Sequence, residues 1–134
     1  MARARPEPKW LSRVVIDAIH DEPLREHGGL SGIRDENVLE SALARPRQKW
    51  HYADHVDVPM LAAAYAFGLV KNHPIRDGNK RVGFLAMVTF LGMNGHDFDA
   101  TDAEVVAEFL ALADGSVSEK ALSEWIKQHA SKRR

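Results

Sequence analysis

The sequence contains no cysteine among its 134 residues. This absence excludes disulfide bonds, thiol nucleophiles and cysteine-ligated zinc sites. The amino terminus is rich in arginine, but no apolar segment of the kind that a secretory signal peptide needs follows it. We therefore expect a cytoplasmic protein.

Long apolar runs and an excess of positive charge are missing as well. The two uncharged apolar segments, residues 60–70 and 82–93, are shorter than the roughly 20 residues that span a bilayer. Lys and Arg total 18 against 19 for Asp and Glu, so the formal net charge is -1. This balance does not favour direct binding to nucleic acid. We expect neither a membrane nor a nucleic acid as a partner.

The two uncharged segments are typical of helices that are buried on all sides. Asp57 can cap the first, with Pro59 in its first turn, and Asn94 with Gly95 can end the second. Strand signals are weak throughout, and this length suits one domain with its own core. The predicted fold class is all-α: a single domain, residues 1–134, with about six helices around a central buried pair.

The helices that precede this pair are predicted from caps and helical spacing. One begins after Ser12 and is kinked or split at Pro23. A short helix, residues 35–44, is stopped by Pro46. Residues 45–58 then form an ordered loop or short hairpin that suits a flap over a substrate segment.

Two capping boxes predict the last two helices. Thr101 with Glu104 opens one helix, and Ser116 with Glu119 opens the other. The first of these helices is expected to turn its apolar residues inward; they are Val105, Val106, Phe109, Leu110 and Leu112.

The polar stretch between the two buried segments, residues 73–81, reads HPIRDGNKR. Pro74 disfavours the helical conformation at His73, so the first buried helix should end there. A new helix then begins near Gly78 or Asn79. A connection this polar must reach solvent or a ligand, because its backbone groups need hydrogen-bond partners.

Lys80 and Arg81 fall in the first turn of this new helix. A helix N-terminus carries roughly half a positive charge, so cations there oppose stability. Free backbone N–H groups together with two cations form a strong anion site, and a phosphate is the obvious ligand. The alternative is a solvated helix start with Asp77 as N-cap. That alternative explains Asp77 and Gly78 but neither the cations nor His73.

The residue types of this stretch predict nucleotide chemistry. His73 suits general-base work near neutral pH. Asp77 suits Mg²⁺, which often binds one or two carboxylates plus substrate phosphates. Asn79, Lys80 and Arg81 suit the phosphates and the charge of the transition state. The combination predicts nucleotide-dependent transfer onto a hydroxyl, but the spacing does not decide which phosphate is attacked.

The stretch HPIRDGNKR resembles the signature of the Fic/Doc family, and His20, residues 28–46 and the two apolar helices resemble its Doc (death-on-curing) branch. The resemblance covers most of the chain. It implies an all-helical Fic fold, the toxin half of a type II toxin–antitoxin pair, ATP as substrate and Mg²⁺. It also implies transfer of the ATP γ-phosphate to a threonine of elongation factor Tu, which blocks translation, and a Phd-like antitoxin that acts in trans.

Carried over by position, the resemblance makes His73 the general base and Asp77 the Mg²⁺ ligand. The nucleotide contacts that it implies are Gly78 and Asn79 at the anion hole, Lys80 and Arg81 on the phosphates, and Lys71, which stands where some Doc loops have an arginine.

Three positions depart from the wider family pattern. Family members that transfer AMP usually have Gly at the position of Lys80 and a second Arg at that of Phe84. A long side chain at position 80 would crowd and re-pair the phosphates, which favours a reversed nucleotide and points to the Doc branch. Ile75 replaces the Phe of the signature, and we expect it to anchor the loop in the core with less area.

Two other functions stay open. Gly78, the small residue of the loop, is compatible with an AMP- or other nucleotidyltransferase of the same fold. The second alternative is a binding module that captures a phosphate, a nucleotide or a partner's tail. Such a module has no need for His73. The sequence has no Ser/Thr-x-x-x-Glu-Gly/Asn inhibitory motif, and it does not identify the groove that an antitoxin would use.

Overall fold

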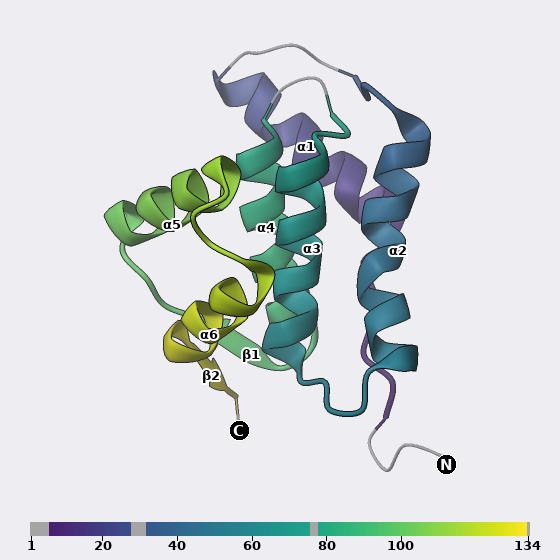
Figure 1. Ribbon diagram of the computed structural model, residues 1–134. Helices are drawn as coiled ribbons and strands as arrows, with labels where there is room; N and C mark the ends of the chain where they lie inside the picture. Colours follow the sequence, from purple (N-terminus) through teal and green to yellow (C-terminus); the bar gives the residue numbers. More distant parts are fainter. Residues whose placement is uncertain (1–5, 28–31, 76–77, 134) are drawn as a thin grey trace.

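The computed structural model describes residues 6–27, 32–75 and 78–133. Within these residues, six α-helices and two short strands follow one another along the chain (Figure 1). They are α1 (Arg13–His27), α2 (Glu36–Tyr52), α3 (Val58–Asn72), α4 (Asn79–Met93), β1 (His96–Phe98), α5 (Asp102–Asp114), α6 (Glu119–His129) and β2 (Ala130–Lys132). The predicted all-α class with about six helices is confirmed.

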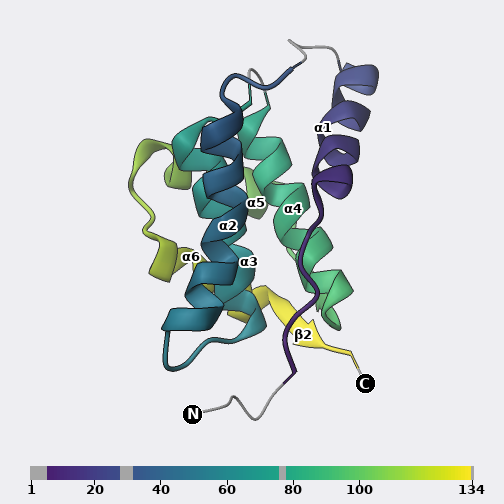
Figure 2. The same cartoon turned by 90° about the vertical axis from the view of Figure 1, so that its right-hand side faces the viewer.

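Helices α3 and α4 form the centre of the fold. α3 packs against α2, α4 and α6, and Figure 2 shows α2 beside α3 and α1 beside α4. Leu69 of α3 and Phe90 of α4 are fully buried, as is Tyr65, whose ring centroid lies 5.1 Å from that of Phe90. The central buried pair is therefore confirmed. No helix in the described part of the chain is both long and apolar enough to cross a membrane.

Two glycines allow the central helices to approach their neighbours closely. A Cβ added at Gly83 of α4 would lie 2.8 Å from Val70 Cγ2 of α3, which no real pair of carbon atoms tolerates. A Cβ at Gly68 of α3 would lie 3.3 Å from Ala42 Cβ of α2. Gly83 faces the end of α3, so this contact fixes the spacing of the two helices near the polar turn that joins them.

Helix α2 is longer than predicted, and the expectation of a loop or hairpin at residues 45–58 is wrong. The helix continues through Pro46, and residues 53–57 are the irregular part. Pro46 is buried, and Trp50, one turn later, is 5% exposed. The free energy gained by burying these side chains outweighs the cost of the helical hydrogen bond that proline cannot donate. Helix α1 is likewise not split at Pro23.

The two carboxyl-terminal helices begin at different kinds of cap. The capping box of Thr101 is present as predicted, with both of its hydrogen bonds formed. The second predicted box, which began at Ser116, is wrong. Ser118 is the N-cap of α6, and its Oγ accepts a hydrogen bond from Ala121 N at 3.0 Å. Ser116 instead donates its hydroxyl to Asp114 at the end of α5.

Helix α5 exposes part of the apolar face that was expected to turn inward. Phe109 and Leu112 are buried, but Val106 is 57% exposed and Leu110 is 53% exposed. The two strands, for which the sequence has weak signals, pair antiparallel as a short two-stranded sheet. A pair of three-residue strands has too little periodicity to be recognised from a sequence.

An ion-pair cluster on Glu119 joins α6 to α2. The Glu119 side chain is 13% exposed, and it accepts hydrogen bonds from Lys49 Nζ at 2.5 Å and from the Arg45 guanidinium. Burial alone would raise the pKa of the Glu119 carboxyl, but the hydrogen bonds from Lys49 and Arg45 outweigh burial and hold that pKa below its ordinary value. Arg45 and Lys49 lie in the segment that was expected to be a loop. Their ion pairs with Glu119 explain in part why this segment is helical.

We expect Glu119→Gln to lower the free energy of unfolding at pH 7 by about 1–3 kcal/mol, since hydrogen bonds to a charged group are lost. A carboxyl whose pKa is lowered by folding stabilises the protein above its unfolded pKa, and this contribution disappears as the pH falls through the folded pKa. The difference between wild type and variant should therefore shrink on acidification from pH 7 to about pH 3. Urea unfolding across this range measures it. Glu124→Gln, an exposed change on the same helix, is the control, and an equal effect of both variants would contradict the account.

Candidate active site

The polar turn between α3 and α4 lies at one end of the central pair (Figure 1) and begins at His73. Helix α3 ends at Asn72 with His73 as its C-cap, as the following Pro74 predicts. His73 has φ 49° and ψ 53°, and it is the one non-glycine residue with positive φ in the described ranges. Such a left-handed conformation costs on the order of 1–3 kcal/mol. The residue is exposed, so the turn holds an imidazole at the surface in a backbone conformation that neighbouring groups must stabilise.

Four consecutive carbonyl groups, from Asn72 at the end of α3 to Ile75 in the turn, accept hydrogen bonds from side chains or backbone N–H groups. The donors are Arg34 Nη2 to Asn72 O (2.9 Å), Arg34 Nε to His73 O (2.5 Å), Arg34 N and Asp35 N to Pro74 O (2.9 and 3.1 Å), and Asn79 Nδ2 to Ile75 O (2.9 Å). Sequence reasoning missed Arg34. A signal was present: a cation directly before the start of α2 opposes the helix dipole, as Lys80 does at α4.

Ile75 anchors the turn in the core. It is 1% exposed and forms an isolated antiparallel bridge with Ile33. Its N–H donates to Asn79 Oδ1 at 3.2 Å, so the Asn79 side chain holds both polar groups of the Ile75 backbone. The expected apolar anchor is confirmed. Asn79 shapes the turn through its side chain, and its contact with a phosphate stays a prediction.

The N-terminus of α4 has the features of an anion site. Gly78 is the N-cap, with φ 85° and no side-chain cap, and the first turn contains no acidic residue. Lys80 and Arg81 are exposed and form no ion pair with any residue that the structure describes. The backbone N–H groups and two cations are therefore available to a ligand with negative charge.

Asp77, the predicted Mg²⁺ ligand and the alternative N-cap, lies outside the described residues, as does Arg76. The described residues contain no group of three or more His, Asp or Glu side chains placed to hold a metal ion. Binding of Mg²⁺ by Asp77 together with substrate phosphates, a donor set that Mg²⁺ commonly uses, stays a prediction.

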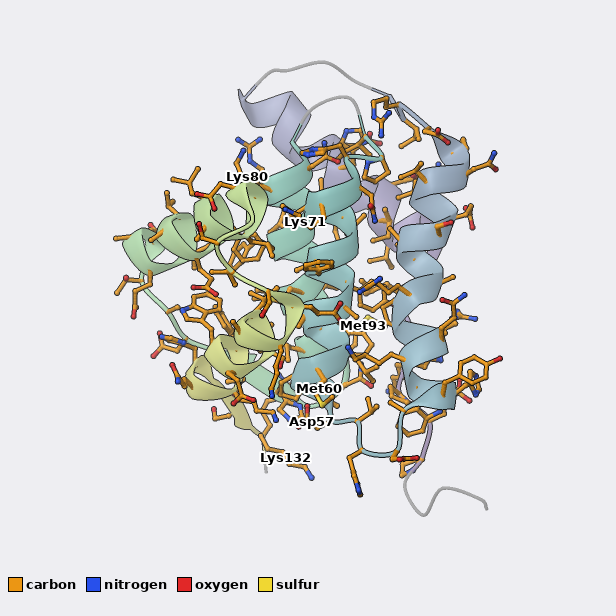
Figure 3. All side chains as sticks on the ribbon, viewed as in Figure 1. Asp57, Met60, Lys71, Lys80, Met93 and Lys132 are labelled. Carbon is orange, nitrogen blue, oxygen red and sulfur yellow. The ribbon has the colours of Figure 1, made fainter. Side chains whose placement is uncertain are left out.

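Two further residues from the sequence analysis, Lys71 and His20, have other surroundings in the structure. Lys71 points to the carboxyl end of α5, where its Nζ lies 3.5 Å from Ala113 O (Figure 3). A cation is favourable at that end of a helix, and a contact of Lys71 with a nucleotide stays a prediction. His20 of α1 is 5% exposed, and its Nε2 has no hydrogen-bond partner in the described part of the chain; it is packed rather than accessible.

A groove with a volume of about 230 Å³ adjoins the cations of α4. Helices α4 and α5 form it, and its lining residues are Lys80, Arg81, Phe84, Val105, Val106, Phe109 and Leu110. Val106 and Leu110, two large apolar side chains of α5 that are exposed, belong to this lining. The groove therefore combines an apolar wall with a positive end next to the turn.

Comparisons with known proteins match the same part of the chain. A family model described as the Fic/DOC family matches residues 10–91, which include helices α1 to α3, the turn and most of α4. A protein named Toxin Doc from Mycolicibacterium smegmatis (strain ATCC 700084 / mc(2)155) is 38% identical over 94 residues, which cover 65% of this chain and 71% of that protein. A protein named Protein kinase doc from Escherichia phage P1 is 27% identical over 114 residues, which cover 84% of this chain and 90% of that protein.

Proposed function

Because this chain belongs to the Fic/DOC family, we propose that the turn at His73 is the active site of a protein-modifying transferase, the toxin of a toxin–antitoxin system. The observation that carries the proposal is the exposed His73, held in a left-handed conformation beside an uncapped helix N-terminus with two unpaired cations in the described residues. A base next to an anion site suits transfer from a nucleotide to a hydroxyl.

In the proposed reaction, His73 takes the proton of a Ser or Thr hydroxyl, and the hydroxyl oxygen attacks the γ-phosphorus of ATP. A new bond forms between that oxygen and phosphorus, the bond from phosphorus to the bridging oxygen breaks, and ADP leaves. Lys80, Arg81 and the N–H groups of α4 offset the charge that the phosphoryl oxygens gather. Asp77 would hold Mg²⁺, which neutralises phosphate charge when bound.

Lys80 is the basis for choosing the γ-phosphate. Its side chain is exposed at the start of α4 (Figure 3), where a long cation would compete for the phosphates and favour a reversed nucleotide. The name of the phage P1 relative, Protein kinase doc, supports the same choice. We propose elongation factor Tu as the acceptor, with cytoplasmic arrest of translation as the outcome.

The purified protein, incubated with bacterial lysate, Mg²⁺ and ATP labelled at either the α- or the γ-phosphate, tests this function. The expected result is one labelled protein of the size of elongation factor Tu, labelled from the γ position alone. Label from the α position would instead identify a nucleotidyltransferase. Tight ATP binding without any labelled protein would identify a binding module.

A Phd-like antitoxin is the proposed partner, and the groove between α4 and α5 is its proposed site. The exposed Val106 and Leu110 fit the apolar face of a short helix, and Lys80 and Arg81 fit acidic groups on the same segment. A segment bound there would lie over the anion site and exclude the nucleotide.

We expect Leu110→Asp to prevent rescue by the antitoxin while growth arrest persists. The new carboxylate stands in the apolar wall of the groove but is too exposed to disturb the core, since Leu110 is 53% exposed. Growth of cells that express the variant with and without its Phd-like antitoxin measures the effect. Val14→Asp, an equally polar change at an exposed site of α1, is the control. Full rescue of Leu110→Asp would contradict the proposed groove.

A further inference from the structure

The carboxyl end of α3 lacks one of its usual donors. A helix that ends on a left-handed residue commonly closes with backbone N–H groups of the next residues, which donate back to its last carbonyls. Here the residue after His73 is Pro74, which has no N–H. The Arg34 guanidinium donates to the carbonyls of Asn72 and His73, at 2.9 and 2.5 Å, which come after the carbonyls that such N–H groups reach. Arg34 therefore holds the chain where it leaves α3, next to a proline that offers no N–H of its own.

We propose that Arg34 is a positioning residue for His73: its guanidinium holds the His73 carbonyl and thereby sets the direction in which the imidazole leaves the backbone. This inference rests on the proposed function of His73. The orientation of a carbonyl fixes the ψ angle of its residue, and ψ together with φ fixes where the Cα–Cβ bond points. A general base must meet the hydroxyl proton at hydrogen-bond distance, so its direction determines the rate.

The guanidinium is suited to this task by its geometry. Nε and Nη2 lie in one rigid plane, so two bonds to adjacent carbonyls define both their positions and their directions. The ammonium of a lysine is a single point charge and cannot reproduce that fork. Arg34 is also exposed, so its loss removes little buried apolar surface.

The support behind Arg34 is rigid. Its own N–H and that of Asp35 both donate to Pro74 O, and Ile33 bridges to Ile75. The Asp35 side chain also accepts from Val38 N at 3.2 Å as the N-cap of α2. The first turn of α2 and the turn at His73 are thus joined through consecutive residues, which keeps the guanidinium in register with the two carbonyls.

Three variants test this role: Arg34→Ala, Arg34→Lys and the control Arg13→Ala. Arg13 pairs with Asp17 and Glu36 on the faces of α1 and α2 and does not touch the turn. The measurements are the maximal rate and the apparent KM for ATP in the γ-label assay with lysate, the thermal midpoint, and the one-bond NMR coupling between the α carbon and α proton of His73, which depends on both φ and ψ. Misplacing a catalytic group by about 1 Å costs on the order of 10²-fold in rate.

The expected result is a maximal rate about 10²-fold lower for Arg34→Ala, with an unchanged KM for ATP, an altered His73 coupling and partial recovery in Arg34→Lys. Arg13→Ala should change the thermal midpoint without changing the rate or the coupling. A wild-type rate in Arg34→Ala, or a rate loss that follows the thermal midpoint equally in Arg34→Ala and Arg13→Ala, overturns the proposal. If the wild-type protein transfers no label, the proposed function fails, and the His73 coupling alone decides whether Arg34 positions the residue.

Discussion

His73→Ala should reduce the transfer of label from ATP to protein by about 10²- to 10⁴-fold, the usual contribution of a general acid or base. The reason is that no other described residue of the turn has a side chain that accepts a proton near neutral pH. The protein should stay folded, because His73 is exposed and its imidazole makes no hydrogen bond to a described residue. Ala in the left-handed conformation adds a strain on the order of 1 kcal/mol, well below the roughly 5–15 kcal/mol that stabilises a typical domain. The labelling assay and the thermal midpoint measure the two effects.

His73→Asn is the matched control for the backbone. Asn tolerates the left-handed conformation better than most residues, so it keeps the shape of the turn while it removes the base. Transfer should fall as far in His73→Asn as in His73→Ala. Full activity in either folded variant would show that the turn does not act through this base.

Arg81→Ala is expected to reduce the rate of transfer by about 10²- to 10³-fold, as removal of one group that stabilises transition-state charge commonly does. Arg81 is exposed in the first turn of α4 and forms no ion pair with a described residue, so its charge is free to act on the phosphates. Arg81→Lys should recover part of the rate, because it restores the charge but not the planar fork. Initial rates of γ-label transfer at saturating ATP measure these effects.

Lys132→Ala is the control for the loss of a positive charge in general. Lys132 lies in β2, at the end of the molecule opposite to Lys80 (Figure 3), and is exposed. It should change the rate less than twofold, since exposed charges at that range are screened by salt. Equal losses in Arg81→Ala and Lys132→Ala would assign the effect to net charge and contradict a phosphate contact.

The elements that could be predicted from the sequence are those whose signal is local. Pro74 indicates where α3 ends and Gly78 indicates where α4 begins. The absence of charge from residues 60–70 and 82–93 indicates that both helices are buried. The elements that were missed depend on contacts distant in sequence. The extension of α2 beyond Pro46 relies on packing and on Glu119, which lies 74 residues after its partner Arg45, and nothing local to Pro46 indicates it.

The candidate site divides in the same way. His73 and the cations of α4 are visible in the sequence, because they lie within a few residues of one another and oppose the preferences of the helix ends. Arg34 lies 39 residues before His73, and its two bonds end on backbone carbonyls, which every residue has. The position of Arg34 before α2 marks it as unusual in the sequence, but no pairing of side-chain types links it to His73, so its partner is visible only in the fold. The outward face of α5 at Val106 and Leu110 was missed because apolar residues usually turn inward.

The most direct test of the central claim is the intact mass of purified elongation factor Tu after incubation with this protein, ATP and Mg²⁺. The account predicts a mass increase of one phosphoryl group with the wild-type protein and no increase with His73→Ala. An increase of one adenylyl group, or a phosphoryl increase of equal extent with folded His73→Ala, would contradict it. An unmodified elongation factor in the presence of a wild-type protein that arrests growth would contradict the proposed acceptor.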